Sequence, residues 1–112
     1  MGSMQKDCLF CQIIRGEKPA DFLFKGESLV VFRDIYPEAP VHLLVVPRIH
    51  IRSINEVTDK DKEIISQMIL KGQEMAKEQG IAASGYKLLF NVERGGGQAI
   101  FHVHLHLLGG WR

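Results

Sequence analysis

Three of the five histidines in this 112-residue chain stand at alternate positions in the stretch AIFHVHLHLLGG, residues 99–110. Alternate residues of a β-strand share one face, so His102, His104 and His106 would lie in a row, with about 13 Å between the outer two. Imidazole is a nucleophile and proton carrier near neutral pH, and a neighbour can hold one ring nitrogen while the other reacts. Burying three imidazoles without a function is costly. The pattern therefore predicts a reactive or ligand-binding site in which the outer histidines have different duties.

Two cysteines near the N-terminus form a second group that could do chemistry. Cys8 and Cys11 have the C-x-x-C spacing with which two thiolates hold one Zn²⁺, and a tetrahedral site needs two further ligands. A redox pair is a second interpretation, which the lack of a βαβ pattern around the motif argues against. Two reduced thiols in a core are a third. A structural zinc site is the interpretation that we favour.

A small set of elements must position these residues. A short helix should run from Cys8 through Ile14 and stop at Gly16. Two prolines within four residues make the segment 34–42 an ordered loop, because proline lacks the N–H that a strand ladder needs. A glycine-rich loop at 92–98 joins the last two strands. Strands are expected at 22–25, 29–33, 42–47, 86–91 and 99–108.

One long helix is expected over 58–79. Thr58 with Asp61 is close to a capping box, and apolar residues then recur at helical spacing as far as Gly80. Gly72 lies inside this helix at a cost of about 1 kcal/mol relative to alanine. This indicates close approach of another backbone, such as a second subunit, and a tolerated surface glycine is the alternative. Five antiparallel strands with a long and a short helix make an α+β domain.

Composition is that of a globular protein. The chain is 46% hydrophobic and 24% charged, and its 14 basic and 13 acidic residues are interspersed, with a formal net charge of +1. It has no basic footprint for long nucleic acid, no apolar run of the ~18–20 residues that span a membrane, and no secretory signal pattern. We expect a cytoplasmic protein with one domain over 4–112, preceded by an expression-tag remnant at 1–3.

The run HVHLHLL, residues 102–108, matches the His-φ-His-φ-His-φ-φ signature of the histidine triad (HIT) superfamily, where φ is apolar. The blocks IIRGEKPA, FRDIYPEAPVHLLVVPRIH, GYKLLFNVERGGGQ and FHVHLHLLGG resemble, in this order, the histidine triad nucleotide-binding proteins, a branch of purine nucleoside phosphoramidate hydrolases. The resemblance covers nearly the whole chain after residue 3. It implies a HIT-like fold and a homodimer in which two five-stranded sheets join into one of ten strands.

The resemblance also implies a reaction. His104 would attack the α-phosphorus of an adenosine or guanosine 5′-phosphoramidate or acyl-nucleotide, and water would hydrolyse the nucleotidyl-histidine to AMP or GMP. His106 would contact the phosphate. His42 would belong to the hydrogen-bonding set behind the nucleophile, and His102 completes the triad.

Binding residues are carried over in the same way. Asp34 would accept hydrogen bonds from the ribose hydroxyls, and Ile35 would form an apolar wall of the base pocket. The phosphate and leaving group would be held by Asn91, Gly97, Gln98 and Ala99, since glycine-rich loops expose backbone N–H groups. Without the resemblance, Asp34 would be a loop cap and Asn91 a turn residue. Ala99 departs from the family, because close relatives often have serine there, and this bears on rate and leaving group.

The C-x-x-C members of the family imply the remaining metal ligands. In them a structural Zn²⁺ is held by the residues that correspond to Cys8, Cys11, His50 and His102. No organic cofactor and no catalytic metal is implied. The alternatives are a dinucleoside polyphosphate hydrolase or nucleotidyl transferase, a slow nucleotide-binding regulatory protein, and a metalloenzyme with the alternating histidines as ligands.

Overall fold

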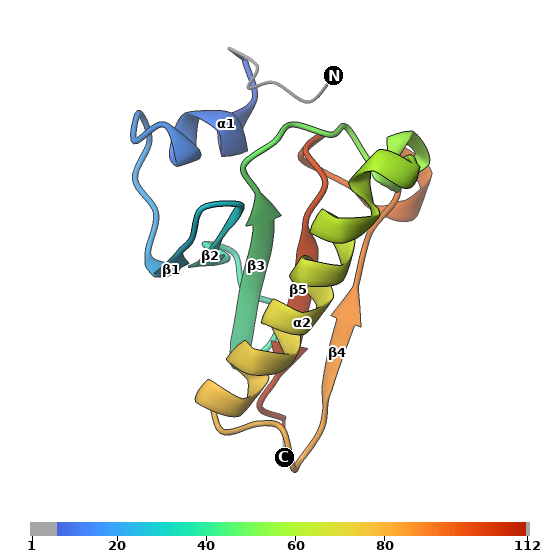
Figure 1. Ribbon diagram of the computed structural model, residues 1–112. Coiled ribbons are helices and arrows are strands. Elements are labelled where there is room, and N and C mark those ends of the chain that lie inside the picture. Colours follow the sequence, from blue (N-terminus) through green and yellow to red (C-terminus); the bar gives the residue numbers. More distant parts are fainter. Residues whose placement is uncertain (1–6, 112) are drawn as a thin grey trace.

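Five strands form one antiparallel sheet, and a long helix crosses one of its faces (Figure 1). The computed structural model describes residues 7–111, so the expected tag remnant at 1–3 lies outside the described residues. The elements are α1 (Leu9–Ile14), β1 (Phe22–Lys25), β2 (Leu29–Arg33), β3 (Val41–Pro47), α2 (Lys62–Glu78), β4 (Tyr86–Leu89) and β5 (Leu105–Gly109), with 3₁₀ turns at Ile54–Glu56, Asp59–Asp61 and Arg94–Gly96. The strand order is β1-β2-β3-β5-β4. The expected α+β fold is confirmed.

Alternation along the inner strands creates two apolar layers. Val31 of β2 packs in the layer that contains α2, whereas Val30 packs in the layer that contains α1. Leu44 of β3 also belongs to the α1 layer and is the direct partner of His106 in the β3–β5 register. Because cross-strand partners share a face, His106 points to the α1 side of the sheet. His42, two residues before Leu44, points the same way.

The long helix begins and ends at the expected signals. The backbone N–H of Thr58 donates to Oδ2 of Asp61 at 3.0 Å in a capping box that leads into α2, and Gly80 follows the helix with a φ of +74°. Gly72 is not a surface glycine, and the close approach expected there is to side chains of the sheet and not to another backbone. It is buried against this chain's own sheet, where a Cβ would lie 2.9 Å from Cδ2 of Leu88. The missing side chain therefore lets α2 approach β4.

The last strand is shorter than expected. It begins at Leu105, and the backbone over 99–104 bends instead of extending the ladder. The N–H of Val103 donates to the carbonyl of Ile51, outside the sheet. Of the three alternating histidines only His106 belongs to β5, so the expected straight row is wrong. The expected strand over 86–91 likewise ends at Leu89.

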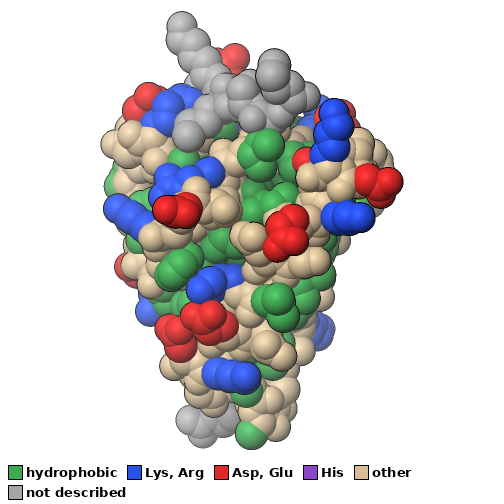
Figure 2. Space-filling model, viewed as in Figure 1, with side chains coloured by type: hydrophobic (Ala, Val, Ile, Leu, Met, Phe, Trp, Pro, Cys, Tyr) green, Lys and Arg blue, Asp and Glu red, His purple; other side chains and the backbone are tan. Residues whose placement is uncertain are grey.

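The face covered by α2 carries a mixed surface. In Figure 2, lysine, arginine, aspartate and glutamate side chains alternate with apolar ones over this face, and none of the described histidines is visible on it. Within residues 7–111, no helix is both long enough and apolar enough to cross a membrane.

Candidate active site and metal centre

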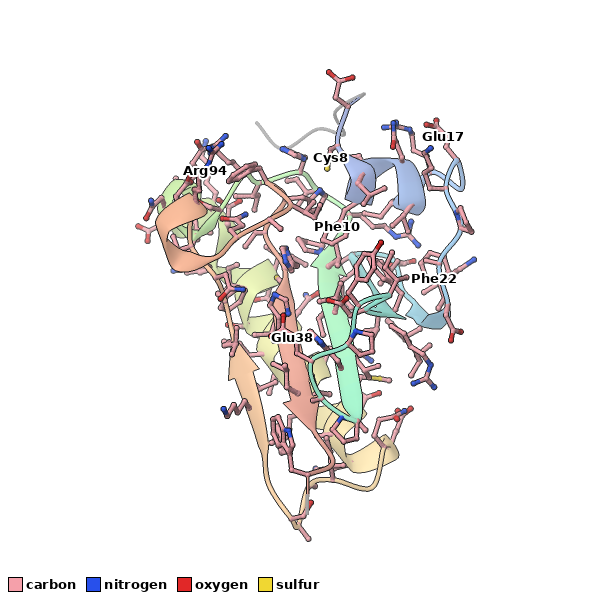
Figure 3. The ribbon with its side chains drawn as sticks, turned by 180° about the vertical axis from the view of Figure 1, so that it is seen from behind. Cys8, Phe10, Glu17, Phe22, Glu38 and Arg94 are labelled. Carbon is pink, nitrogen blue, oxygen red and sulfur yellow. The ribbon has the colours of Figure 1, made fainter. Side chains whose placement is uncertain are left out.

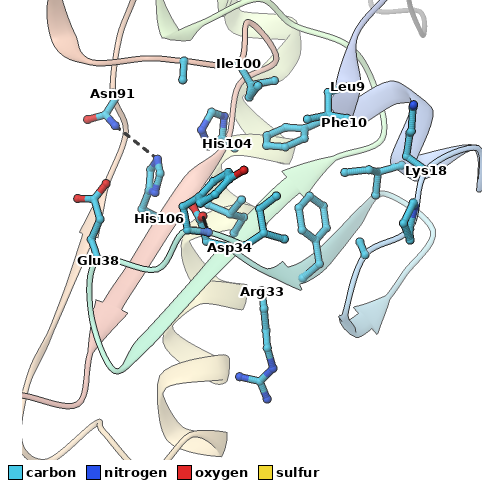
Figure 4. A pocket seen from close by; sticks show the side chains of 18 of the residues that line it. Leu9, Phe10, Lys18, Arg33, Asp34, Glu38, Asn91, Ile100, His104 and His106 are labelled. Carbon is cyan, nitrogen blue, oxygen red and sulfur yellow. Dashed lines mark hydrogen bonds between the residues drawn. The ribbon is translucent and has the colours of Figure 1, made fainter.

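A cavity of about 550 Å³ opens on the α1 side of the sheet, a size suited to a small organic ligand. Figure 3 shows this side, with Phe10 of α1 above the sheet and Glu38 on the loop between β2 and β3. In the close view, His106 and Asn91 lie at one end of the cavity and Lys18 at the other (Figure 4). Its apolar wall is formed mainly by Leu9, Phe10, Ile13, Phe32, Ile35, Leu44 and Ile100.

His104 is held in one tautomer by its own chain. Its Nδ1 donates to the carbonyl oxygen of His102 at 2.7 Å, so the neutral ring carries a lone pair on Nε2. The ring is buried, lines the cavity and meets the ring of Phe10 edge-on, with centroids 5.0 Å apart. Burial lowers the pKa of His104 below its usual value. The ring therefore stays in the neutral, nucleophilic form near neutral pH.

A chain of hydrogen bonds fixes His106. The N–H of Glu38 donates to Nδ1 of His42 at 3.1 Å, which places the proton of a neutral His42 on Nε2. That Nε2 lies 2.9 Å from Nδ1 of His106 and donates to it. The proton of His106 is consequently on Nε2, which lies 3.4 Å from Nδ2 of Asn91 at the end of the cavity. Both groups are N–H donors in this arrangement, so a ligand oxygen between them can accept from both. Burial, followed by the neighbouring His104 and His42, lowers the pKa of His106 to about 4.

Asp34 and Ile35 form part of the cavity's rim. Oδ1 of Asp34 accepts the N–H of Tyr36 at 2.8 Å, which orders the loop, and Oδ2 lies 3.4 Å from Nε2 of His42. The carboxylate thus stands between the histidines and the apolar wall. Ile35 is 74% exposed at the cavity mouth. Both residues therefore line the cavity, Asp34 beside His42 and Ile35 at the mouth.

The residues in and beside the glycine-rich loop differ in whether they line the cavity. Asn91, Gly97 and Ala99 line the cavity, whereas Gln98, the last residue of the loop, is buried and does not. Its Nε2 donates to the carbonyls of Arg52 and Ile100 at 2.7 and 3.0 Å. Its Oε1 accepts the N–H of Glu93 at 2.8 Å. These bonds occupy the Gln98 side chain within the protein, so its placement does not support direct phosphate contact.

The four expected metal ligands converge at the start of α1. Nδ1 of His102 lies 3.3 Å from Sγ of Cys8, 3.5 Å from Sγ of Cys11 and 3.2 Å from Nδ1 of His50. Tetrahedral zinc bonds of ~2.0–2.3 Å require ligand separations of about 3.3–3.6 Å between such atoms. Nε2 of His102 donates to the carbonyl of Pro47 at 2.8 Å, which leaves Nδ1 with the lone pair that a metal needs.

The charge states of the two imidazoles suit metal binding, whereas the Cys8 thiol must lose its proton when a metal binds. Burial raises the pKa of the Cys8 thiol to about 11 and lowers the pKa of His102 to about 4 and that of His50 below its usual value. Neutral imidazoles are ready ligands, and a bound cation offsets the cost of a buried thiolate. A redox pair or two core thiols would leave the convergence of two imidazole nitrogens unexplained. The four residues fit a metal ion.

A second group, Asp34, His42 and His106, also brings three ligand atoms within 4.8 Å of one another. Here the hydrogen bonds argue against coordination. Nδ1 of His42 already faces the N–H of Glu38, so Nε2 must carry the proton and acts as a donor. A metal on Nε2 would require an imidazolate or a broken bond. This group is better suited to proton positioning than to the metalloenzyme alternative.

Sequence reasoning missed the wall contributed by α1. Leu9, Phe10 and Ile13 have the spacing of an ordinary core-facing helix, and Phe10 and Ile13 are indeed buried. Their position in and next to the C-x-x-C motif could have indicated this role. A metal that joins α1 to the segment of His102 must also bring the neighbouring residues of α1 close to the histidines. The hydrogen-bonding role of Glu93 was also missed.

Comparison with known proteins assigns the class. Residues 7–110 match the family described as "Scavenger mRNA decapping enzyme C-term binding". The purine nucleoside phosphoramidase of Escherichia coli (strain K12) is 40% identical over 107 residues, which cover 96% of this chain and 90% of that protein. Together with the histidine pattern and the five-stranded sheet, these matches show that the chain belongs to the histidine triad family.

Solved structures refine the assignment. A HIT family hydrolase from Legionella pneumophila Philadelphia 1 is 46% identical, with a TM-score of 0.92 and 95% of each chain covered. A histidine triad protein from Clostridium difficile is 34% identical, with a TM-score of 0.94, covering 98% of this chain and 96% of that one. The protein is a hydrolase of the histidine triad family.

Proposed function

We propose that this hydrolase cleaves purine nucleoside 5′-phosphoramidates or acyl-nucleotides to AMP or GMP through a nucleotidyl intermediate on His104. The observation that carries the proposal is the hydrogen bond from Nδ1 of His104 to the His102 carbonyl. It leaves a buried imidazole on the cavity wall with its reactive lone pair on Nε2. The E. coli relative named purine nucleoside phosphoramidase supports the substrate class.

Both chemical steps exchange one bond at phosphorus. Nε2 of His104 bonds to the α-phosphorus as the P–N bond breaks, and the amine leaves with its electron pair and one added proton. Ala99 lines the cavity and has no proton to give, so water supplies this proton. A second water then passes a proton to the hydroxide left by the first and forms a P–O bond while the bond to His104 breaks, which restores the imidazole and releases the mononucleotide. Nε2–H of His106 donates to a phosphate oxygen throughout.

The other residues hold the nucleotide. Asp34 accepts the ribose hydroxyls, and the base lies against Ile35 and the apolar wall. Asn91 and the backbone at Gly97 hold the phosphate end, as their places around the cavity support.

Zinc is the proposed metal of the cysteine–histidine cluster. Two thiolates and two imidazoles are a closed zinc ligand set, and such sites are typically structural. When bound, the ion supplies a cross-link between α1 and the segments that carry His50 and His102.

A homodimer in the cytoplasm belongs to the same proposal. β4 lies at one edge of the sheet, with its outer backbone groups available for pairing with a second copy. Two copies joined there would make the ten-stranded sheet that the family resemblance implies.

Rapid mixing with adenosine 5′-phosphoramidate, followed by acid quench and intact-mass measurement, tests the reaction. The wild type should gain the mass of one nucleotidyl group, and His104→Asn should not gain it while still binding AMP. An adduct on the His104→Asn protein would refute the nucleophile. Turnover confined to dinucleoside polyphosphates would instead support the polyphosphate hydrolase. AMP binding with negligible turnover would support the slow regulatory protein, which Ala99 favours.

A further inference from the structure

Glu93 has a backbone conformation that is nearly exclusive to glycine. Its φ is +61° and its ψ is 176°, and it is the one non-glycine residue with positive φ among residues 7–111. For a residue with a Cβ this region is strained, and strain of this kind persists only where surrounding contacts impose it. A glycine would take the conformation freely. The side chain of Glu93 must therefore contribute something that offsets the strain.

The carboxylate is held by two consecutive residues of a distant segment. Arg52 donates through Nη2 at 3.0 Å and through Nε at 3.2 Å, and Ser53 donates through Oγ at 2.6 Å. Ser53 is buried, with 1% of its surface exposed. The hydrogen bonds with Arg52, followed by the one from Ser53, lower the pKa of Glu93. Glu93 is thus ionised and firmly oriented at neutral pH.

The backbone of Glu93 closes the glycine-rich loop at its other end. Its carbonyl accepts the N–H groups of Gly96 and Gln98 at 3.0 and 3.1 Å, and its N–H donates to the Gln98 side chain. Gln98 in turn donates to the carbonyl of Arg52 at 2.7 Å. The loop is therefore hydrogen-bonded to Arg52 twice, through the Glu93 carboxylate and through the Gln98 side-chain amide.

This fastened loop forms the phosphate end of the cavity. Gly97, within it, and Ala99, directly after it, line the cavity together with Asn91, which directly precedes it. Three consecutive glycines at 95–97 would give this stretch great freedom if nothing held it. Ordered backbone N–H groups bind an anion well only when their positions are fixed in advance.

We propose that Glu93 is a positioning residue that fixes the glycine-rich loop for the phosphate part of the ligand. The inference rests on the proposed function, because it takes a nucleotide phosphate as the group bound there. The strained backbone is retained because glutamate, unlike glycine, fastens the loop to Arg52 and Ser53. Stability and ligand affinity should consequently respond in different ways to its replacement.

Glu93→Gly tests this split. The variant loses the hydrogen bonds to Arg52 and Ser53 but also the backbone strain at residue 93. Its thermal midpoint should therefore stay within a few degrees of the wild type. Its Kd for AMP should rise about tenfold, whereas its Kd for adenosine, which has no phosphate, should change less than twofold. With adenosine 5′-phosphoramidate, KM should rise more than kcat falls. Glu93→Gln, which can still accept from Ser53, should recover part of the AMP affinity.

Matched variants separate the outcomes. Glu74→Gln removes the exposed Lys71–Glu74 ion pair on α2 and should leave both ligands unaffected. Arg52→Gln should reproduce the selective loss of AMP and serves as the test should Glu93→Gly not fold. Unchanged AMP affinity in Glu93→Gly or Arg52→Gln, or an equal loss for AMP and adenosine, overturns the role. A wild type that binds neither ligand refutes the proposed function instead.

Discussion

The carbonyl oxygen of His102 lies 2.7 Å from Nδ1 of His104 and accepts its proton. The same His102 directs its own Nδ1 at two thiols and its Nε2 at the carbonyl of Pro47. One residue thus belongs to the metal cluster through its ring and orients the proposed nucleophile through its backbone. Phe10, between the two cysteines, adds a second link, because its ring meets both His102 and His104 edge-on.

Removing the metal should therefore affect the cavity as well as the fold. We expect wild-type protein to hold one zinc per chain and Cys8→Ser to lose it, with a lower thermal midpoint, because metal-binding free energy adds to folding free energy. AMP affinity should fall in the same variant, since α1 carries part of the cavity wall. Elemental analysis, thermal unfolding and calorimetric titration with AMP measure the three effects.

Asp34→Ala is the control for that experiment. It should retain zinc and the wild-type thermal midpoint within a few degrees while losing affinity for AMP. If untagged wild-type protein held no metal, or if Cys8→Ser kept its stability, the structural zinc would be wrong.

The ribose prediction can be tested on the ligand as well as on the protein. A carboxylate that accepts both hydroxyls should bind AMP more tightly than 2′-deoxy-AMP, because each hydrogen bond to a charged group contributes ~1.5–3 kcal/mol. Asp34→Asn should bind the two nucleotides with nearly equal affinity. Equal affinity already in the wild type would mean that Asp34 only orders the loop through the N–H of Tyr36.

Much of this architecture follows from local sequence signals. β1 and β2 have their expected bounds, because a turn-prone segment separates two short apolar runs. The capping box at Thr58 and the left-handed Gly80 bracket the long helix as expected. The metal cluster was predictable because a ligand set depends on residue type and family pattern, and the four side chains indeed converge.

What escaped prediction depends on contacts between distant segments. Alternation alone cannot show that the backbone bends before Leu105, because the bend is set by the bond from Val103 to Ile51 and by the His102–His104 contact. The strain at Glu93 is equally invisible, since it follows from Arg52, which lies 41 residues away. Gly72 was misjudged because its close contact is a side chain of its own sheet.

Phe10 should couple packing to chemistry. Its ring is buried against Phe32 and His104, with centroids 5.4 and 5.0 Å away. Phe10→Ala should cost about 3–5 kcal/mol of unfolding free energy, as is usual for a buried phenylalanine. Phe10→Leu should keep most of the stability but lower kcat, because the aromatic ring that packs edge-on against His104 is lost. Urea unfolding and steady-state kinetics of both variants give the comparison; a wild-type kcat in Phe10→Leu would contradict the coupling.

The pH dependence of stability provides the last prediction. Burial holds the pKa of His106 at about 4 in the folded chain, well below the ~6.5 of an unfolded histidine. Above pH 6.5 the ring is neutral in both states, so its titration does not change the free energy of unfolding. Between about pH 6.5 and 4, His106 binds a proton in the unfolded chain but not in the folded chain. The free energy of unfolding therefore falls as the pH is lowered. Below pH 4 both states are protonated and this contribution levels off.

His106→Asn removes the titrating group while keeping a polar side chain. The free energy of unfolding of this variant, measured with urea, should therefore fall less steeply than that of the wild type between pH 6.5 and 4, with both proteins in the same metal state. Parallel pH curves for the two proteins would show that His106 is not buried in its neutral form.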